Sequence, residues 1–454
     1  MTRRRWRGER TAGPKRARAS GLALVVVGAA VGCTENVTAP GRCQDYCPSG
    51  QITVVDTMLR TVIERDSAFR GYLLPHEGAV LLAASLAAVD SRPIFRLDTL
   101  QAGFRFGTDT TLRPITVDSA RLQLAITRRD TNATNLTLKV YRLPITIDTA
   151  ATFASLAAAF ADPPVDSVNV TVMLALPPVF DSTVSDTVRT DPATGHKLRI
   201  NRSTGLITLL LLFDTSEARY VAADSGKVAY GVRVSADSLA SIALEAAFEL
   251  DPLSLPQGPR MTWFVRADSS GTAVPRTLVT FTVFDSFVLD PPAPAIDSTL
   301  AVGGIPAARS LLRVRLPRFI RDSTQILRAT LLLVPVSAAQ GAPIDSLLLL
   351  AHGVEADLGK KSPLVTQRFL GDSTRMAATW VHTGSLDTVR IEITRLLRTW
   401  SIDTTLDPAF MLRIVPEGSR LGEIRFRPSA DSTVPNARPA IRITYAERFP
   451  FGVP

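Results

Sequence analysis

The sequences VAYGVRV, residues 228–234, and PAFMLRI, residues 408–414, indicate the fold of this chain. Each is a short apolar run with one arginine near its end, which is typical of a β-strand with a buried face. Similar runs recur from residue 66 onward, separated roughly every ten residues by Asp-Ser, Asp-Thr, Pro or Gly. The pattern predicts an all-β protein of antiparallel β-sandwich type. Short helices are expected at residues 152–161 and after Thr394, with Thr394 as the cap.

These two sequences belong to an internal repeat, because strand-like blocks recur in the same order in both halves of the chain. Residues 91–97 resemble 308–314, 119–124 resemble 328–333, 228–234 resemble 408–414, and 258–264 resemble 438–444. The offset between the copies falls from 217 residues at Phe95 to 180 at Tyr230, so the first copy contains about 37 additional residues. The repeat predicts two homologous sandwiches in tandem.

The boundary between the two copies is expected at the Pro-rich stretch 290–294, which cannot lie in a central strand. We therefore predict a first sandwich with an insertion at residues 56–290 and a second sandwich at residues 291–454. Residues 54–63 fit a strand or a helix equally well.

The amino-terminal residues 1–32 resemble a lipoprotein signal peptide, with an arginine cluster, an uncharged stretch and small residues before Cys33. The sequence AVGC ending at Cys33 resembles a bacterial lipobox, so we expect Cys33 to carry the lipid that anchors the exported chain to a membrane. The alternative is an ordinary signal cut near Ala29 or Ala30. Thr34 stands where an Asp would favour the inner membrane, and this favours the outer membrane of the cell envelope.

Residues 33–55 form a polar linker that contains the other two cysteines, Cys43 and Cys47. If Cys33 is acylated, these two are the only pair that could form a disulfide in an exported protein. A tight turn between them would satisfy the geometry of a disulfide, whereas an extended chain would not. We expect a small disulfide loop that stiffens the linker.

The basic charge of the chain does not predict nucleic-acid binding. The formal net charge is +9, but the first 32 residues hold eight of the 51 Lys and Arg and one of the 42 Asp and Glu, which leaves +2 for the rest. No apolar run approaches the ~20 residues that span a bilayer as a helix. Frequent Pro and few aromatics argue against a transmembrane barrel.

The strand blocks of the second copy resemble a known family. The residues 391–400, 410–414 and 438–445 resemble the carboxy-terminal half of a DNRLRE domain, and 310–314 and 329–333 resemble its first half. The resemblance covers nearly all of the second copy and mainly the strands of the first, which lacks a tryptophan equivalent to Trp400. It implies a jelly-roll sandwich of the kind appended to secreted polysaccharide-active enzymes, with carbohydrate binding in some members.

The sequence offers little for catalysis. The four histidines are not at metal-ligand spacing, and no P-loop, GxGxxG or GxSxG motif is present. Many Asp residues directly precede Ser or Thr, as at Asp297 and Asp345, where the carboxylate is expected to bond backbone amides in turns. Two distant carboxylates could still form a glycosidase site. We expect a protein that is not an enzyme and needs no cofactor or metal; calcium binding stays open.

Aromatic and arginine side chains are the candidates for ligand binding. Trp263 and Trp400 lie within the repeated strands and are expected to be buried. Trp380 and Tyr72 are less constrained: packing within the fold is the first alternative for each, and stacking on a sugar ring is the second. Arginines recur on the strands and could meet acidic sugars or simply form a solvated face: Arg96, Arg121, Arg233, Arg313 and Arg413.

The predicted function is that of a monomeric, membrane-anchored envelope lipoprotein that binds polysaccharide or glycan without cleaving it. The alternative is a structural or adhesion scaffold that contacts another envelope protein and binds no sugar. A third hypothesis is a hydrolase whose two carboxylates come from distant strands.

Overall fold

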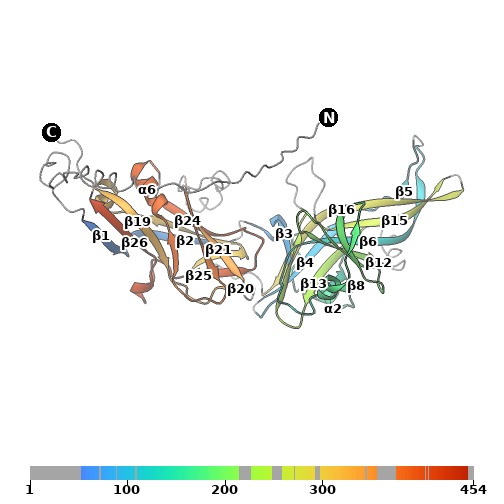
Figure 1. Cartoon of the computed structure of the whole chain (residues 1–454), viewed down its shortest axis with the longest axis horizontal. Helices are drawn as coiled ribbons and strands as arrows, with labels where there is room; N and C mark the ends of the chain where they lie inside the picture. Colours follow the sequence, from blue (N-terminus) through green and yellow to red (C-terminus); the bar gives the residue numbers. More distant parts are fainter. Residues whose placement is uncertain are drawn as a thin grey trace, which may run out of the picture. The chain divides into compact units, whose positions relative to one another are not determined.

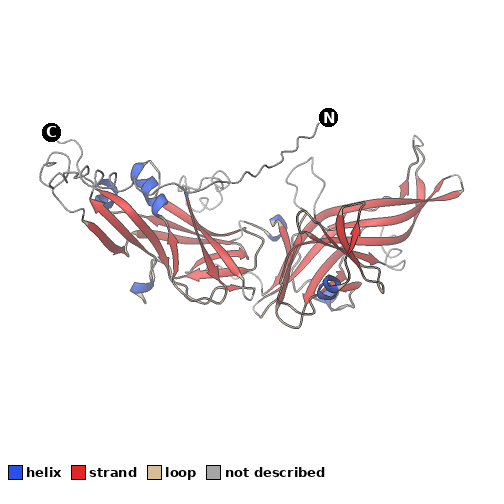
Figure 2. Ribbon diagram, viewed as in Figure 1, coloured by secondary structure: helices blue, strands red, loops and turns tan. Residues whose placement is uncertain are grey.

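The computed structural model describes residues 53–70, 73–87, 89–107, 110–213, 226–247, 258–269, 271–291, 297–342, 345–354, 375–403, 405–406 and 408–447. The chain divides into residues 1–53 and a compact unit of residues 54–454. The fold is all-β with antiparallel sheets, as predicted (Figure 2). Of the described residues, 54% lie in strands and 9% in helices. No helix within the described ranges is both long enough and apolar enough to cross a membrane.

Two sheets form what we call the C-terminal sandwich (Figure 1). The four-stranded sheet has the order β1 (Val54–Leu59), β26 (Ala440–Glu447), β19 (Thr324–Leu333) and β23 (Val389–Glu392). The eight-stranded sheet has the order β20 (Gln340–Gly341), β25 (Gly422–Phe426), β17 (Leu300–Ile305), β18 (Ala308–Val314), β24 (Ala409–Val415), β21 (Ser346–Gly353) and β22 (Met376–His382), with β2 (Ile63–Arg70) on β18. One apolar core contains side chains from both sheets, including Leu331, Phe410 and Ile443.

The remaining strands form one 14-stranded sheet. Its order is β8 (Asp166–Asn169), β7 (Thr137–Arg142), β13 (Ala229–Ser235), β4 (Asp90–Leu97), β16 (Thr272–Asp290), β15 (Arg260–Ser269), β6 (Arg113–Arg129), β12 (Ile207–Phe213), β11 (Lys197–Ile200), β10 (Asp186–Thr190) and β9 (Val179–Asp181); β3 (Val80–Ser85), β14 (Ala240–Glu245) and β5 (Gly103–Phe104) pair off this path. The strands β4, β16, β15, β6, β14 and β3 form a closed circuit of hydrogen-bonded neighbours. The sheet therefore curls around the core that contains Leu122, Leu124 and Trp263.

Alternation along the strands builds this core. Leu122, Leu124 and Trp263 are fully buried, whereas the residues between them along β6 and β15 are partly exposed. The Trp263 Nε1 atom donates a hydrogen bond of 3.0 Å to Thr280 Oγ1 on β16, so the buried indole N–H is satisfied.

The helices are short: α2 (Ala157–Ala161), α3 (Val170–Ala175), α5 (Arg318–Asp322), α6 (Thr394–Ile402), and the 3₁₀ turns η1 (Pro75–Glu77) and η5 (Pro435–Ala437). The helix predicted at residues 152–161 is limited to its last turn. The helix after residue 393 is present, but Thr394 is its first residue and not its cap. The Thr394 hydroxyl instead accepts a 2.7 Å hydrogen bond from the Ala329 N–H, which ties α6 to β19.

The blocks of the predicted repeat are strands that pair in the same register in both parts of the chain. Tyr230 on β13 lies opposite Phe95 on β4, and the equivalent Phe410 on β24 lies opposite Leu312 on β18. Likewise, the pair Met261–Leu122 on β15 and β6 corresponds to the pair Ile441–Leu331 on β26 and β19. The sequence similarity therefore coincides with equivalent strand contacts.

Residues 54–70 pair with strands of the second predicted sandwich, although the sequence pattern predicts residues 56–290 in the first. β1 pairs with β26, and β2 pairs with β18, so both strands complete the C-terminal sandwich and do not belong to the sheet of residues 80–290. The start of a first domain at residue 56 does not match this pairing. The physical reason is that β16 already occupies the corresponding edges of β15 and β4 in the 14-stranded sheet.

Candidate functional site

The candidate site lies around the exposed side chain of Trp380 on β22. Among the described residues, β22 pairs only with β21, so it forms an edge of the eight-stranded sheet. Val381 is buried in the sandwich core, and strand alternation therefore directs Trp380 to the outer face. Its side chain is 58% exposed, which is unusual for a tryptophan in a strand.

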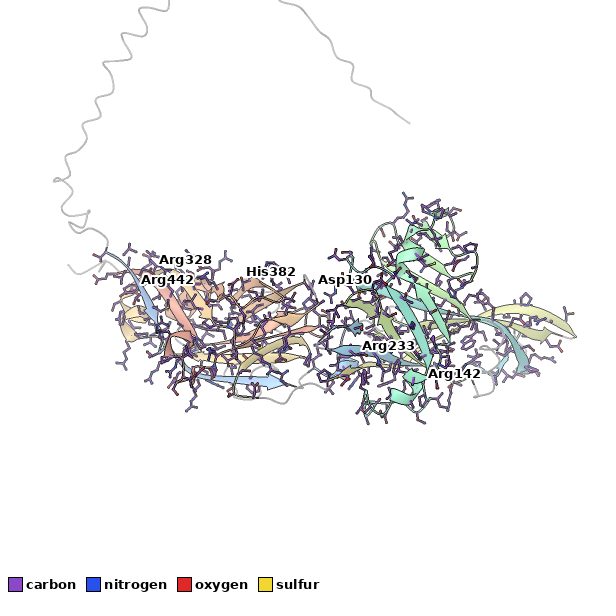
Figure 3. The ribbon with its side chains drawn as sticks, turned by 90° about the horizontal axis from the view of Figure 1, so that it is seen from below. Asp130, Arg142, Arg233, Arg328, His382 and Arg442 are labelled. Carbon is purple, nitrogen blue, oxygen red and sulfur yellow. The ribbon has the colours of Figure 1, made fainter. Side chains whose placement is uncertain are left out.

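Polar and apolar groups surround the indole in adjacent rows of the sheet. Leu348 on β21 lies directly opposite Trp380 on one side and opposite Val415 of β24 on the other. One row further along, Ser346 lies opposite His382, which is labelled in Figure 3. The Ser346 Oγ and His382 Nδ1 atoms are 2.8 Å apart. The site thus places a flat apolar ring next to a hydroxyl and an imidazole.

A carboxylate with two arginines borders this end of the site. Asp345 accepts a 2.7 Å hydrogen bond from Arg420 Nη1 and another of 2.7 Å from Arg128 Nη1. The Ser346 N–H donates to the same carboxylate at 2.8 Å. A polar hollow of about 160 Å³ opens beside Asp345, lined also by Arg129 and Asn132. Donors and acceptors that can bond sugar hydroxyls therefore lie at the start of β21, the strand that pairs with the Trp380 strand.

Ser346 and His382 form a hydrogen-bonded pair of two groups, whereas a serine hydrolase uses a triad. A serine nucleophile needs a base that is itself oriented by a third group. Within the described part of the chain, Ser346 is the sole hydrogen-bond partner of the His382 ring, and the pair lies on an open strand surface. The described residues also include no group of three or more His, Cys, Asp or Glu side chains that could hold a metal ion.

A second hollow, of about 220 Å³, has an almost entirely apolar wall that includes Leu73, Phe287 and Ile305. Arg70 also lines it, but its guanidinium forms two hydrogen bonds of 2.7 Å with Glu423. This hollow offers few polar groups for a sugar, so the Trp380 surface fits a glycan better.

The other predicted residues have different outcomes. Trp263 and Trp400 are buried, at 0% and 4% exposure, which confirms the prediction for both. Tyr72, Cys33, Cys43 and Cys47 lie outside the described residues, so the ligand, lipid and disulfide predictions at those positions stay predictions.

The Asp-Ser and Asp-Thr sequences serve two purposes in the structure. Asp297 accepts from the Thr299 N–H at 2.8 Å, two residues on, which is the predicted turn role. Asp345 accepts from the Ser346 N–H and also binds Arg128 and Arg420. Its role could not be found from the sequence, because the arginines come from remote parts of the chain and the local sequence is that of a turn.

Searches against protein-family models and against curated proteins find no match to this chain.

Proposed function

We propose that this chain is a glycan-binding protein of the cell envelope without catalytic activity, and that Trp380 is the surface on which a sugar ring stacks. The exposed indole beside Ser346, His382 and Asp345 is the observation that carries the proposal. Amphipathic sugar rings need an apolar plane together with hydroxyl partners, and binding sites of this kind combine aromatic walls with a few polar groups. The predicted DNRLRE resemblance agrees with such a role.

A glycan array with the chain from residue 48 onward, which retains every described strand, would test this proposal. Binding of the identified glycan is then compared by calorimetry between the parent and Trp380→Ala. We expect at least tenfold weaker binding, equal to about 1.4 kcal/mol, because the stacking plane is lost. The unfolding free energy should change by no more than about 0.5 kcal/mol, since the ring is exposed.

Phe180→Ala is the matched control, because Phe180 is also an exposed aromatic on a strand, with 56% exposure, but lies in the 14-stranded sheet. It should leave glycan affinity unchanged. A blank array, or equal loss of affinity in both variants, would contradict the proposal and favour the scaffold role in which the protein contacts another envelope protein.

We further propose that Cys33 carries the lipid that holds the protein at the outer membrane, with Cys43 and Cys47 joined by a disulfide. In a bacterial host, Cys33→Ser should move the full chain from the membrane fraction to the soluble fraction. Cys43→Ser should remain in the membrane fraction. Mass spectrometry of the mature terminus without acyl groups on Cys33 would contradict this part of the proposal.

A further inference from the structure

Two arginines lie next to each other on one face of the 14-stranded sheet. The neighbours of Arg121 along β6 and of Arg260 along β15 are buried, so both arginine side chains point to the opposite face. Arg121 lies opposite Thr262, and Arg260 lies opposite Gln123. The two arginines are therefore diagonal neighbours about 7–8 Å apart.

Both guanidinium groups are partly buried without a bound carboxylate. Within the described ranges, neither forms an ion pair, and the buried Nε atom of Arg121 has no hydrogen-bond partner. Burial lowers the pKa of Arg121, and burial also lowers the pKa of Arg260. The charge of Arg199 lowers the Arg260 pKa further, and Glu245 partly offsets this effect. A partly desolvated charge that lacks a counter-ion is energetically costly.

The more deeply buried arginines of the chain differ in this respect. Arg70 binds Glu423 at 2.7 Å, and Arg92 binds Asp90 at 2.8 Å. Each pair neutralises its own charge, so it needs no external partner. Within the described residues, the guanidinium groups of Arg121 and Arg260 have no such ion pair, although the charge of Glu245 acts on Arg260.

We propose that this face binds an acidic polysaccharide, with successive carboxylate groups on Arg121 and Arg260. A guanidinium can bind a carboxylate through two parallel hydrogen bonds. The two arginines are on adjacent strands of one face, so each can take a separate carboxylate of a polymer with repeated acidic groups. Gln123 and Thr262, which lie between them on the same face, offer partners for sugar hydroxyls.

The Phe264 ring helps to position the guanidinium group of Arg121 in this site. The Arg121 Cζ atom lies 5.1 Å from the centroid of that ring. A cation–π contact holds the guanidinium against the sheet but leaves its charge in place. The site is separate from the Trp380 surface, so either proposal can fail without the other.

Binding of the full chain to polygalacturonate, measured by calorimetry at several salt concentrations, tests this site. We expect binding to polygalacturonate and none to its fully methyl-esterified form. Arg121→Gln and Arg260→Gln should each weaken binding about tenfold, as loss of a charge-assisted contact predicts, and each should reduce its salt dependence. Because neither arginine has an ion pair to lose, both variants should keep the parent melting temperature within about 4 °C.

Arg266→Gln is the matched control, since Arg266 is also on β15 but forms an ion pair of 2.5 Å with Asp118. It should bind as the parent does. Gln123→Glu leaves both arginines in place and supplies an internal carboxylate, so it should also weaken binding. Equal binding of the esterified polymer, equal loss in Arg266→Gln, parent-like binding by Gln123→Glu, or equally tight binding to phosphatidylglycerol vesicles or to inorganic phosphate would overturn the proposal.

Discussion

The 14-stranded sheet and the C-terminal sandwich fill equivalent strand positions with different segments of the chain. In the sheet, β16 follows β15 along the chain and pairs with both β15 and β4. In the sandwich, the equivalent pairings are made by β1 with β26 and by β2 with β18 (Figure 1). Equivalent positions in space are therefore filled by residues 272–290 in one part and by residues 54–70 in the other.

A pair of aspartates shows how closely the two parts correspond. Asp285 on β16 lies opposite Phe95, and Asp66 on β2 lies opposite the equivalent Leu312. The Ala247 N–H donates to Asp285 at 2.6 Å, and the Ser429 N–H donates to Asp66 at 2.5 Å. Each carboxylate thus bonds a backbone N–H of the segment that precedes β15 in one part and the equivalent β26 in the other. The comparison teaches that the same local contact is preserved although the connectivity has changed.

Deletion of residues 54–70 should have the largest effect, and it should fall on the C-terminal sandwich alone. Val62 and Ile63 are buried in its core, and loss of one such side chain costs about 2–5 kcal/mol. Domains of this size are stable by only about 5–15 kcal/mol. Hydrogen exchange should show loss of protection in β18 and β26, with β6 and β15 unchanged.

The chain that begins at residue 48 is the control for this deletion, because it keeps both strands. A synthetic peptide of residues 54–70, added to the deleted chain, should restore part of the protection. Unchanged protection of β18 and β26 after deletion would show that the first two strands are dispensable, and the comparison would fail.

The sequence predicted the all-β fold and the blocks of the repeat, because alternating apolar residues report a buried face locally. It did not predict the partners of residues 54–70, since the contact between Met58 and Arg442 joins residues far apart in the chain. The residues around Trp380 could not be predicted either, because they also come from distant parts of the chain. An exposed and a buried tryptophan have the same local sequence signal, and the repeat alone placed Trp263 in a core.

The buried indole of Trp263 offers a second way to distinguish the two parts. Thr280→Val keeps the side-chain shape but leaves the Trp263 N–H without its acceptor, which should cost about 1–3 kcal/mol of unfolding free energy. Denaturant unfolding followed by tryptophan fluorescence measures this change. The equivalent positions in the C-terminal sandwich are Leu59 and Ile443, which have no such hydrogen bond to lose.

Thr280→Ser retains the hydroxyl and should lose much less stability. The double variant Trp263→Phe with Thr280→Val removes both partners, so it should cost less than the sum of the single changes. Additive costs would mean that the hydrogen bond does not contribute.

The pH dependence of stability should have opposite signs in the two parts. Burial raises the pKa of Asp285, and the Ala247 N–H and His76 partly oppose this shift. The contribution of Asp285 to stability is therefore complete below the ordinary pKa and is lost as the pH rises through the raised pKa. The Thr433 hydroxyl, then Arg427 and the Thr433 N–H, lower the pKa of Asp431 to about 2. Its contribution is present above the ordinary pKa and is lost as the pH falls toward 2.

Thermal unfolding between pH 2 and pH 7 should therefore separate the two carboxylates. Asp431→Asn should reduce the loss of stability that the C-terminal sandwich shows in acid. Asp285→Asn should reduce the loss of stability that the 14-stranded sheet shows above about pH 4. A parent-like pH profile in both variants would refute the assignment.

The smallest effect is expected at the exposed edge of the β1–β26 pairing. Arg442 Nη2 lies 2.5 Å from Asp56 Oδ2, and the two side chains are 60% and 42% exposed. Exposed ion pairs contribute little because water and salt screen them, so Arg442→Gln should lower the melting temperature by no more than about 4 °C. The difference should disappear in 1 M salt, where screening acts over about 3 Å. A larger loss that persists in high salt would mean that this ion pair, and not the buried Val62 and Ile63, holds the first two strands in place.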